Sequence, residues 1–214
     1  MELRPALIDS TVGHLRRGRR VALLLRHAER GPIIDLAKHH EVLLTPQGHL
    51  NAAASGERLA AAMVKDLTDV ALFHSPVKRC AETAQGLCRG FVAKGGRGLV
   101  SGERSAFGAS YLKDEAGVAR AFLRHGRGFV RAWFDGDIDA DVIDPSDIVA
   151  GRQIAALVEV LQQHSFVVAV SHDWNIAAVR EHALGQRFED HGWPQFLDGV
   201  VGFIEGKKFT VDPG

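Results

Sequence analysis

The hydrophobic pattern of the chain alternates between short apolar runs and longer segments in which apolar residues recur every three or four positions. The apolar runs are rich in Val, Leu and Ile and cover 21–25, 70–73, 98–101 and 166–170. The longer segments have the spacing of one helical face and cover 46–64, 80–91, 154–161 and 174–184. Strands that alternate with helices in this way predict an α/β fold with a mostly parallel sheet.

Two parts of the chain depart from this alternation. Residues 104–150 contain one predicted helix, at 118–133 and weakened by Gly126, followed by an acidic loop. We interpret this region as an insertion over one end of the sheet. The sequence GVVGFIEGKKFTV at 199–211 predicts two edge strands joined by a tight turn. Residues 191–194, just before these strands, are either pocket residues or ordinary packing.

The composition narrows the range of partners. The chain has 214 residues, 46% of them hydrophobic, and 26 Lys and Arg balance 26 Asp and Glu. A net charge of zero argues against partners that need a broad positive field, such as duplex DNA or an anionic membrane surface. No apolar run approaches the roughly 18 residues of a membrane span, and no export signal precedes Val21, so we expect a cytoplasmic protein. Cys80 and Cys88 fall on one predicted helix, too far apart for a disulfide.

Three of the apolar runs end in unusual clusters of polar residues. The run at 21–25 leads into RHAERGP, the run at 70–73 into HSPVKR, and the run at 166–170 into SHD. In open α/β sheets, ligands bind outside the carboxyl ends of the strands. If the three strands are parallel neighbours, their ends meet at one site with three arginines, two histidines and at least one acid.

Such a set of side chains suits a phosphate dianion. Arginine offers a planar fork that matches phosphate oxygens, and a neutral histidine nitrogen can attack phosphorus to form a phosphohistidine. Neighbouring arginines would lower the pKa of that histidine, and a carboxylic acid near the phosphate can protonate the leaving alkoxide. The eleven histidines of the chain show no convincing spacing for metal ligands, so we expect metal-independent chemistry without a cofactor.

These clusters resemble the motifs of a known family. RHAERGP at 26–32 looks like the RHGxRxP signature of the histidine phosphatase superfamily, specifically of its acid-phosphatase branch, with Ala28 in place of the usual glycine. SHDWNIAAV at 171–179 resembles the HD motif of that branch. HSPVKRCAETA at 74–84 is similar to the segment that carries the third arginine of the family. SGERSAFG at 101–108 faintly resembles the segment from which the mutase branch takes its proton donor.

The resemblance implies a role for each matching residue. His27 would be the nucleophile, and Asp173 the proton donor, with Glu103 in reserve because the mutase branch uses a glutamate. The residues implied to hold the phosphate are Arg26, Arg30, Arg79 and His172. Asn175, which follows the HD motif, is a possible pocket residue.

We therefore expect a single domain over 1–214, a three-layer α/β/α sandwich similar to phosphoglycerate mutase. Its expected function is hydrolysis of a small phosphomonoester through a phosphohistidine at His27. Two alternatives stay open: a phosphoglycerate-mutase-like phosphotransferase that uses the same histidine, and a non-catalytic module that binds phosphorylated ligands. The loop at 31–45 and the insertion at 104–150 are expected to face the leaving group, whose identity the sequence does not indicate. The oligomeric state is also left open.

Overall fold

The apolar runs of the sequence form the centre of a mixed β-sheet. In the computed structural model, which describes residues 1–34, 36–63 and 69–214, the strand order is β3-β2-β4-β1-β5-β6. The strands are β1 (Arg20–Arg26), β2 (Asp69–His74), β3 (Arg97–Glu103), β4 (Phe166–Ser171), β5 (Gly199–Glu205) and β6 (Lys208–Asp212). Strands β3, β2, β4 and β1 run parallel, whereas β5 pairs antiparallel with both β1 and β6. The predicted α/β fold with a mostly parallel sheet is confirmed.

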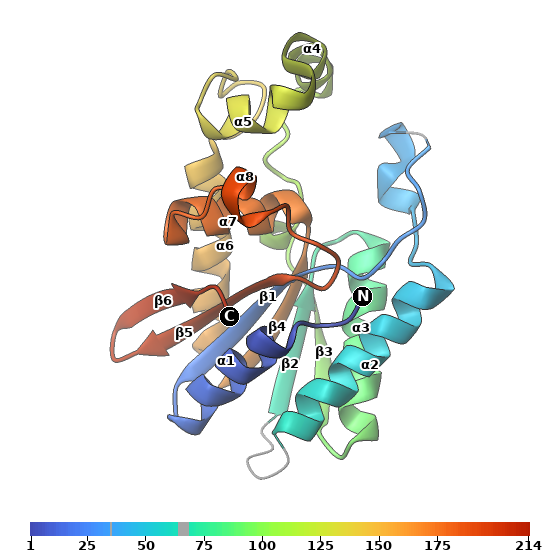
Figure 1. Ribbon diagram of the computed structural model, residues 1–214, viewed down its shortest axis with the longest axis vertical. Coiled ribbons are helices and arrows are strands. Elements are labelled where there is room, and N and C mark those ends of the chain that lie inside the picture. Colours follow the sequence, from blue (N-terminus) through green and yellow to red (C-terminus); the bar gives the residue numbers. More distant parts are fainter. Residues whose placement is uncertain (35, 64–68) are drawn as a thin grey trace.

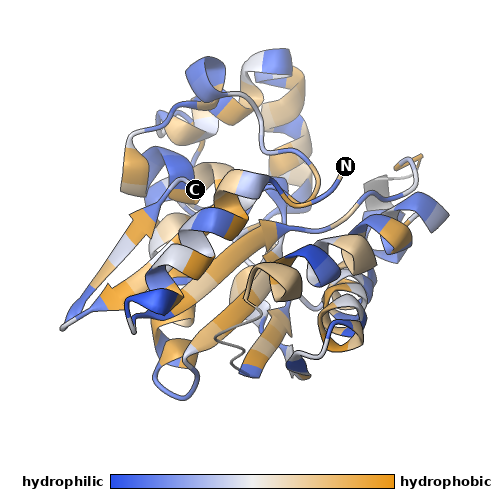
Figure 2. Ribbon diagram, turned by 60° about the horizontal axis from the view of Figure 1, so that its bottom comes forward, coloured by the Kyte–Doolittle hydropathy of each residue, from blue (hydrophilic) through white to orange (hydrophobic). Residues whose placement is uncertain are grey.

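Helices cover both faces of the sheet and complete a three-layer arrangement (Figure 1). One face carries α1 (Pro5–Arg16), α2 (Pro46–Ala62) and α3 (Lys78–Ala93). The opposite face carries α6 (Ser146–Leu161) and α7 (Asp173–Leu184). The hydropathy colouring shows apolar strands between helices whose outer sides are polar (Figure 2).

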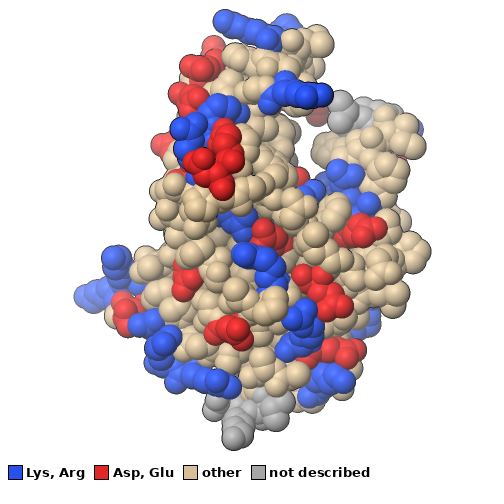
Figure 3. Space-filling view, in the orientation of Figure 1, with Lys and Arg blue, Asp and Glu red and all other residues tan. Residues whose placement is uncertain are grey.

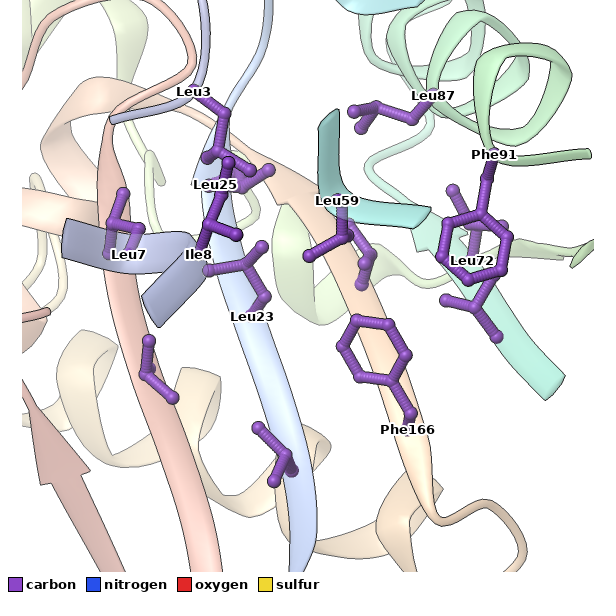
Figure 4. Packing of buried hydrophobic residues seen from close by; sticks show 14 of the residues in the cluster. Leu3, Leu7, Ile8, Leu23, Leu25, Leu59, Leu72, Leu87, Phe91 and Phe166 are labelled. Carbon is purple, nitrogen blue, oxygen red and sulfur yellow. The ribbon is translucent and has the colours of Figure 1, made fainter. Parts of the chain in front are cut away.

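The two faces have separate hydrophobic cores because successive strand residues point to opposite sides. On β1, Leu23 and Leu25 belong to the core under α1 to α3, whereas Ala22 and Leu24 belong to the core under α6 and α7. The first core is seen from close by in Figure 4, where Phe166 of β4 lies among leucines from the helices and from β1.

Helices α2 and α3 pack with their backbones almost in contact. A Cβ atom built on Gly90 would lie 1.9 Å from the carbonyl oxygen of Ala53, and one on Gly56 would lie 2.1 Å from that of Leu87. Only glycine permits so close an approach between two helices. Because α3 follows directly after β2, its N-terminal end lies at the carboxyl edge of the sheet.

Helix α2 begins with a capping residue followed by proline. The hydroxyl of Thr45 accepts a hydrogen bond from the backbone N–H of Gly48 at 2.9 Å, and Pro46 occupies the first helical position. Val64, at the end of the predicted helix, and residue 35 in the predicted 31–45 loop lie outside the described residues. The rest of that loop contains the short helix η1 (Leu36–Glu41).

The region at 104–150 differs from the single helix that the sequence predicted. It contains η2 (Ser105–Phe107), α4 (Glu115–His125), η3 (Gly126–Gly128) and α5 (Phe129–Phe134). The predicted helix breaks at Gly126, whose φ of 53° lies in the left-handed region that favours glycine. We call α4 and α5 the cap, because they stand beyond the carboxyl ends of the parallel strands (Figure 1).

Two further differences concern the ends of the chain. Helix α1 was not predicted, and its apolar residues Leu7, Ile8 and Val12 are buried against the sheet. The expectation of two edge strands is wrong for β5, which lies inside the sheet between β1 and β6.

The short helix α8 (Phe188–His191) connects α7 to the segment before β5. None of the helices among the described residues is both long and apolar enough to cross a membrane.

Candidate active site

The three polar clusters meet because the strands that carry them are neighbours. Strand β4 lies between β2 and β1, and all three run parallel. Arg26 at the end of β1 is paired in register with Ser171 at the end of β4, and His74 of β2 is paired with Val170. The surface has a notch between the cap and the segment that contains η1, on the same side as these strand ends (Figure 3).

His27 follows β1 and is held in one tautomer. Its Nδ1 lies 2.8 Å from the carbonyl oxygen of Ala28, which can only accept, so Nδ1 carries the ring proton. The Nε of Arg79, which can only donate, lies 3.0 Å from Nε2 of His27. The free lone pair of the ring is therefore on Nε2 and points toward the arginines.

The surroundings of His27 keep its ring neutral. Burial lowers the pKa of His27 well below its ordinary value, and His172 and Arg79 lower it further. The sequence predicted this direction from the arginines, but burial is the larger cause. A neutral ring with its lone pair on Nε2 has the form required of a nucleophile at neutral pH.

Arg26 is a buried cation with one unused donor. Its Nη1 donates to the carbonyl oxygen of Pro194 at 2.7 Å, and its Nη2 pairs with Oδ2 of Asp173 at 3.0 Å. Its Nε is buried and has no acceptor among the residues that the structure describes. An unsatisfied buried donor costs about 1–3 kcal/mol, so this atom marks a place for an acceptor.

Arg79 and Arg30 complete the positive cluster. Arg79 is the second residue of α3, and its Nη1 donates to the carbonyl oxygen of His39 at 2.7 Å. Arg30 donates from Nη1 to the carbonyl oxygen of Gly31 at 2.8 Å and is partly exposed. Burial lowers the pKa of Arg79, and the positive charge of Arg30 lowers it further, so the guanidinium groups lie close enough to repel one another.

His172 faces His27 across the site. The two rings are arranged edge to face, with their centroids 5.6 Å apart. The Nε2 of His172 forms a hydrogen bond with the hydroxyl of Ser75 at 2.8 Å. Burial, and then the charge of Arg79, lower the pKa of His172 to about 3, so this ring is neutral as well.

The structure brings Asp173, but not Glu103, to the arginines. Asp173 is the first residue of α7, its side chain is 25% exposed, and it pairs with Arg26 as described above. Glu103 ends β3, which β2 separates from β4. The side chain of Glu103 is exposed and forms no hydrogen bond or ion pair within the described part of the chain.

Asn175 lies one layer behind the site. Its side chain is fully buried, and its amide nitrogen donates to the carbonyl oxygens of Phe107 and Gly108, at 3.2 and 3.0 Å. These bonds fasten the start of the 104–150 region to α7.

Among the described residues, no group of three or more His, Cys, Asp or Glu side chains could hold a metal ion.

Neighbouring segments fix the backbone of the RHAERGP loop. The backbone N–H of Ala28 donates to the hydroxyl of Thr83 at 3.0 Å, and Ala28 is buried against Leu44 and Leu197. Ala28 has an ordinary negative φ, since Leu197 is the one described residue other than glycine with a positive φ. The alanine is therefore accommodated where the family signature has glycine.

Several residues of the site were not assigned to it from the sequence. Ser75 contacts His172, the indole N–H of Trp193 donates to Oδ2 of Asp173 at 3.2 Å, and the ring of Phe196 lies 4.3 Å from the guanidinium carbon of Arg26. The position of residues 191–194 just before the last strands indicated that Trp193 could be a pocket residue. The sequence pattern could not distinguish this role from ordinary packing.

A comparison with protein families bears directly on these motifs. Residues 22–94 match the family model described as the histidine phosphatase superfamily, branch 1. The resemblance to the histidine phosphatase superfamily is thereby confirmed. The matched region includes the loop with Arg26, His27 and Arg30 and the helix with Arg79. The narrower resemblance to the acid-phosphatase branch stays a prediction.

Solved structures support the same fold. A mycobacterial glucosyl-3-phosphoglycerate phosphatase has a TM-score of 0.60 at 14% identity, over 91% of this chain and 98% of that chain. The phosphoglycerate mutase of Bacillus anthracis has a TM-score of 0.56 at 15% identity, over 92% of each chain. The phosphoserine phosphatase of Entamoeba histolytica has a TM-score of 0.52 at 14% identity, over 89% of this chain and 94% of that chain. A search among curated proteins finds no match. At these identities the likeness shows the fold, which is that of phosphoglycerate mutase and related phosphatases.

Proposed function

We propose that the protein is a phosphomonoester hydrolase that acts through a phosphohistidine at His27. One observation carries the proposal: the buried ring of His27 is protonated on Nδ1 and directs its free Nε2 lone pair into a cluster of arginines. A buried cationic cluster attracts a phosphate dianion, and a neutral imidazole within it can attack the phosphorus. The substrate would be a small phosphorylated molecule.

The arginines would hold the phosphate oxygens through the transfer. The Nε of Arg26 has no acceptor among the described residues, and Arg79 now donates to the nucleophilic nitrogen itself. When the phosphate binds, its oxygens would take both donors, which frees Nε2 of His27 for attack. Charge that develops on the transferring group is then opposed by donors already in place.

Asp173 would protonate the leaving alkoxide. Its carboxylate now pairs with Arg26, and a bound dianion would compete for that guanidinium. Loss of the cationic partner and the approach of a dianion both favour the protonated acid. As the phosphorus–oxygen bond breaks and the Nε2–phosphorus bond forms, the proton moves to the leaving oxygen. Water would then hydrolyse the phosphohistidine, with Asp173 as the base.

The test is hydrolysis of p-nitrophenyl phosphate by the wild type and by His27→Ala, in buffer that contains EDTA. We expect turnover by the wild type and none by the variant, because the variant has no nucleophile. His182→Ala is a control, since the ring of His182 is likewise held by a 2.8 Å hydrogen bond, to the hydroxyl of Ser146, but lies outside the site. A phosphorylated intermediate trapped by denaturation should be stable in base and labile in acid. Absence of wild-type turnover over a wide pH range, with phosphate still bound, would refute hydrolysis and favour a binding module.

A phosphotransferase uses the same nucleophile and is separated from a hydrolase by its product. The likeness of the fold to a phosphoglycerate mutase makes this the second candidate. Free inorganic phosphate as the sole product supports hydrolysis, whereas a phosphoryl group moved to a second hydroxyl supports transfer. Phosphorylated sugars, nucleotides, glycolytic acids and phosphoproteins should be screened with both assays.

A further inference from the structure

The segment before β5 crosses directly over the end of β1, and we call residues 193–198 the strap. The backbone N–H of Arg26 donates to the carbonyl oxygen of Asp198 at 2.8 Å, and that of Leu197 donates to the carbonyl oxygen of His27 at 3.4 Å. Asp198 is itself fastened by Arg4 and Arg180, whose guanidinium nitrogens lie 2.8 and 2.9 Å from its Oδ1.

The strap contains a strained residue. Leu197 is fully buried and has a φ of 57°, in a region that residues other than glycine rarely adopt. Such a conformation costs of order 1–3 kcal/mol and persists only where the surroundings impose it, often at functional sites. The path of the strap is therefore imposed by its contacts and not by local preference.

Side chains and carbonyls of the strap enclose the pair of Arg26 and Asp173. Pro194 accepts from Nη1 of Arg26, and Phe196 covers the guanidinium plane. At the other end of the strap, the indole N–H of Trp193 donates to Oδ2 of Asp173 at 3.2 Å. The same Oδ2 pairs with Arg26, which leaves the carboxyl group held from two sides.

The two oxygens of Asp173 have different surroundings. Oδ1 accepts from the backbone N–H of Trp174 at 3.1 Å, within the first turn of α7. Oδ2 accepts from Arg26 and from Trp193. Because the guanidinium is the partner for which phosphate competes, Oδ2 is the oxygen whose surroundings change when phosphate binds. The indole has no such competitor and stays in place.

We propose that Trp193 is the positioning residue of Asp173: its indole N–H holds Oδ2 toward the phosphate site after Arg26 turns to the substrate. The inference rests on the proposed function, because it assigns how the acid of that reaction is aimed. When Asp173 takes up a proton, the proton is bound to Oδ2, which still accepts from the indole N–H. The proton then passes from Oδ2 to the leaving oxygen. The proposal adds to the reaction a residue that does not touch the phosphate.

Other charged and titratable groups also face Asp173. Besides Arg26 from β1, they are Arg79 and Cys80 from α3, and Tyr111 from the segment after η2. Burial raises the pKa of Cys80 to about 12, and it also raises that of Tyr111, so both are uncharged near neutral pH. Replacement of Trp193 by phenylalanine therefore removes the neutral hydrogen-bond donor to Oδ2 and leaves these other groups in place.

The test compares Trp193→Phe with Trp133→Phe. Phenylalanine keeps an aromatic ring against Phe188, whose ring centroid lies 5.3 Å from that of Trp193, but it lacks the N–H. Trp133 is the matched control because its indole N–H also donates one bond, at 2.8 Å, to the carbonyl oxygen of Asp144 in the 104–150 region. Both variants lose an indole hydrogen bond, but only Trp193→Phe loses the bond to Asp173.

The kinetic readout is the ratio of rates for esters with good and poor leaving groups. For Trp193→Phe we expect kcat for an alkyl phosphate to fall about tenfold, as for a lost hydrogen bond to a charged group, with little change for p-nitrophenyl phosphate. The basic limb of the pH–rate profile should move to higher pH, because the indole no longer stabilises the carboxylate. In the Asp173→Asn background the same substitution should have no further effect on the ratio. A ratio and a pH profile equal to those of Trp133→Phe would overturn the proposal.

A second readout does not depend on turnover. The indole N–H resonance of Trp193 should shift with pH and on addition of inorganic phosphate, and the pH response should disappear in Asp173→Asn. The resonance of Trp133 should show neither response. A Trp193 resonance that is insensitive to Asp173→Asn would refute the positioning role, even if the enzyme is active. If the protein shows no turnover but the Trp193 resonance still responds to pH, the hydrolase proposal is refuted, whereas the contact between Trp193 and Asp173 is supported.

Discussion

The Nε of Arg79 lies 3.0 Å from Nε2 of His27, so a cation now occupies the lone pair that would attack phosphorus. Arg79 is held at its other end by the carbonyl oxygen of His39. The contact favours the neutral ring and would align the proposed nucleophile with the proposed phosphate-binding group. In the proposed reaction, the substrate would take over this donor before Nε2 attacks.

Replacement of Arg79 by lysine should weaken both binding and turnover. Lysine keeps the charge but lacks the planar fork that can bind phosphate through two donors. We expect kcat/KM for p-nitrophenyl phosphate to fall about 100-fold, the scale of one lost donor to transition-state charge, and inhibition by inorganic phosphate to weaken. Arg89→Lys is the matched control, because Arg89 lies on the same helix but is exposed on a surface groove next to Cys88 and Val100. Equal rates for the two variants would contradict a phosphate-binding role for Arg79.

The two buried histidines should make stability depend on acidity. The pKa of His172 is lowered to about 3, and that of His27 lies well below 6.5, so the unfolded chain binds more protons between these values. Stability is therefore greatest above about pH 6.5 and falls as the pH decreases, by up to ~1.4 kcal/mol per pH unit for each ring. Urea unfolding of the wild type and of His172→Asn between pH 7 and pH 4 measures this. The variant should show a shallower slope, and an unchanged slope would mean that His172 is not buried as a neutral ring.

Ser75 should affect catalysis through His172. Its hydroxyl forms the 2.8 Å bond to Nε2 that orients the second histidine of the site. We expect Ser75→Ala to lower kcat about tenfold, on the scale of one hydrogen bond near the reacting groups. Ser146→Ala removes a serine–histidine bond of the same length, to His182, away from the site. Thermal unfolding of both variants separates lost stability from lost activity, and a loss of kcat common to both would argue against a specific role for Ser75.

The contact between α2 and α3 should not tolerate a methyl group. A Cβ on Gly90 would lie 1.9 Å from the carbonyl oxygen of Ala53, so Gly90→Ala must push the helices apart. We expect a loss of about 1–3 kcal/mol, which overpacking typically costs. Gly151→Ala is the control, because a Cβ there meets no atom within 4 Å and alanine favours the helix by up to about 1 kcal/mol. Calorimetry should give a lower Tm for the first variant and an equal or higher Tm for the second.

Local patterns determined most of the secondary structure before any contact was known. The runs at 21–25, 70–73, 98–101 and 166–170 are strands, because β-branched and aliphatic side chains in short runs fit a buried sheet. The N-terminal hydrogen bond of Thr45 in α2 and the interruption of the predicted helix at Gly126 also have local causes, namely side-chain hydrogen bonding and backbone sterics. Gly126 was expected only to weaken that helix, but α4 ends there. Helix α1 was missed because its apolar residues stand among polar ones, and only burial against the sheet reveals their face.

The sequence by itself determined which residues could form a site, because each cluster directly follows a strand and parallel neighbours end at the same edge. Only the tertiary structure decided which side chains meet there. The sheet order places β4 between β1 and β2, and so brings Ser75 to His172, which is 97 positions away in the chain. It also leaves Glu103 on the far strand and carries Trp193 over Asp173. The physical reason is range: steric and hydrogen-bonding preferences act within a few residues, whereas the order of strands is set by burial of the whole sheet.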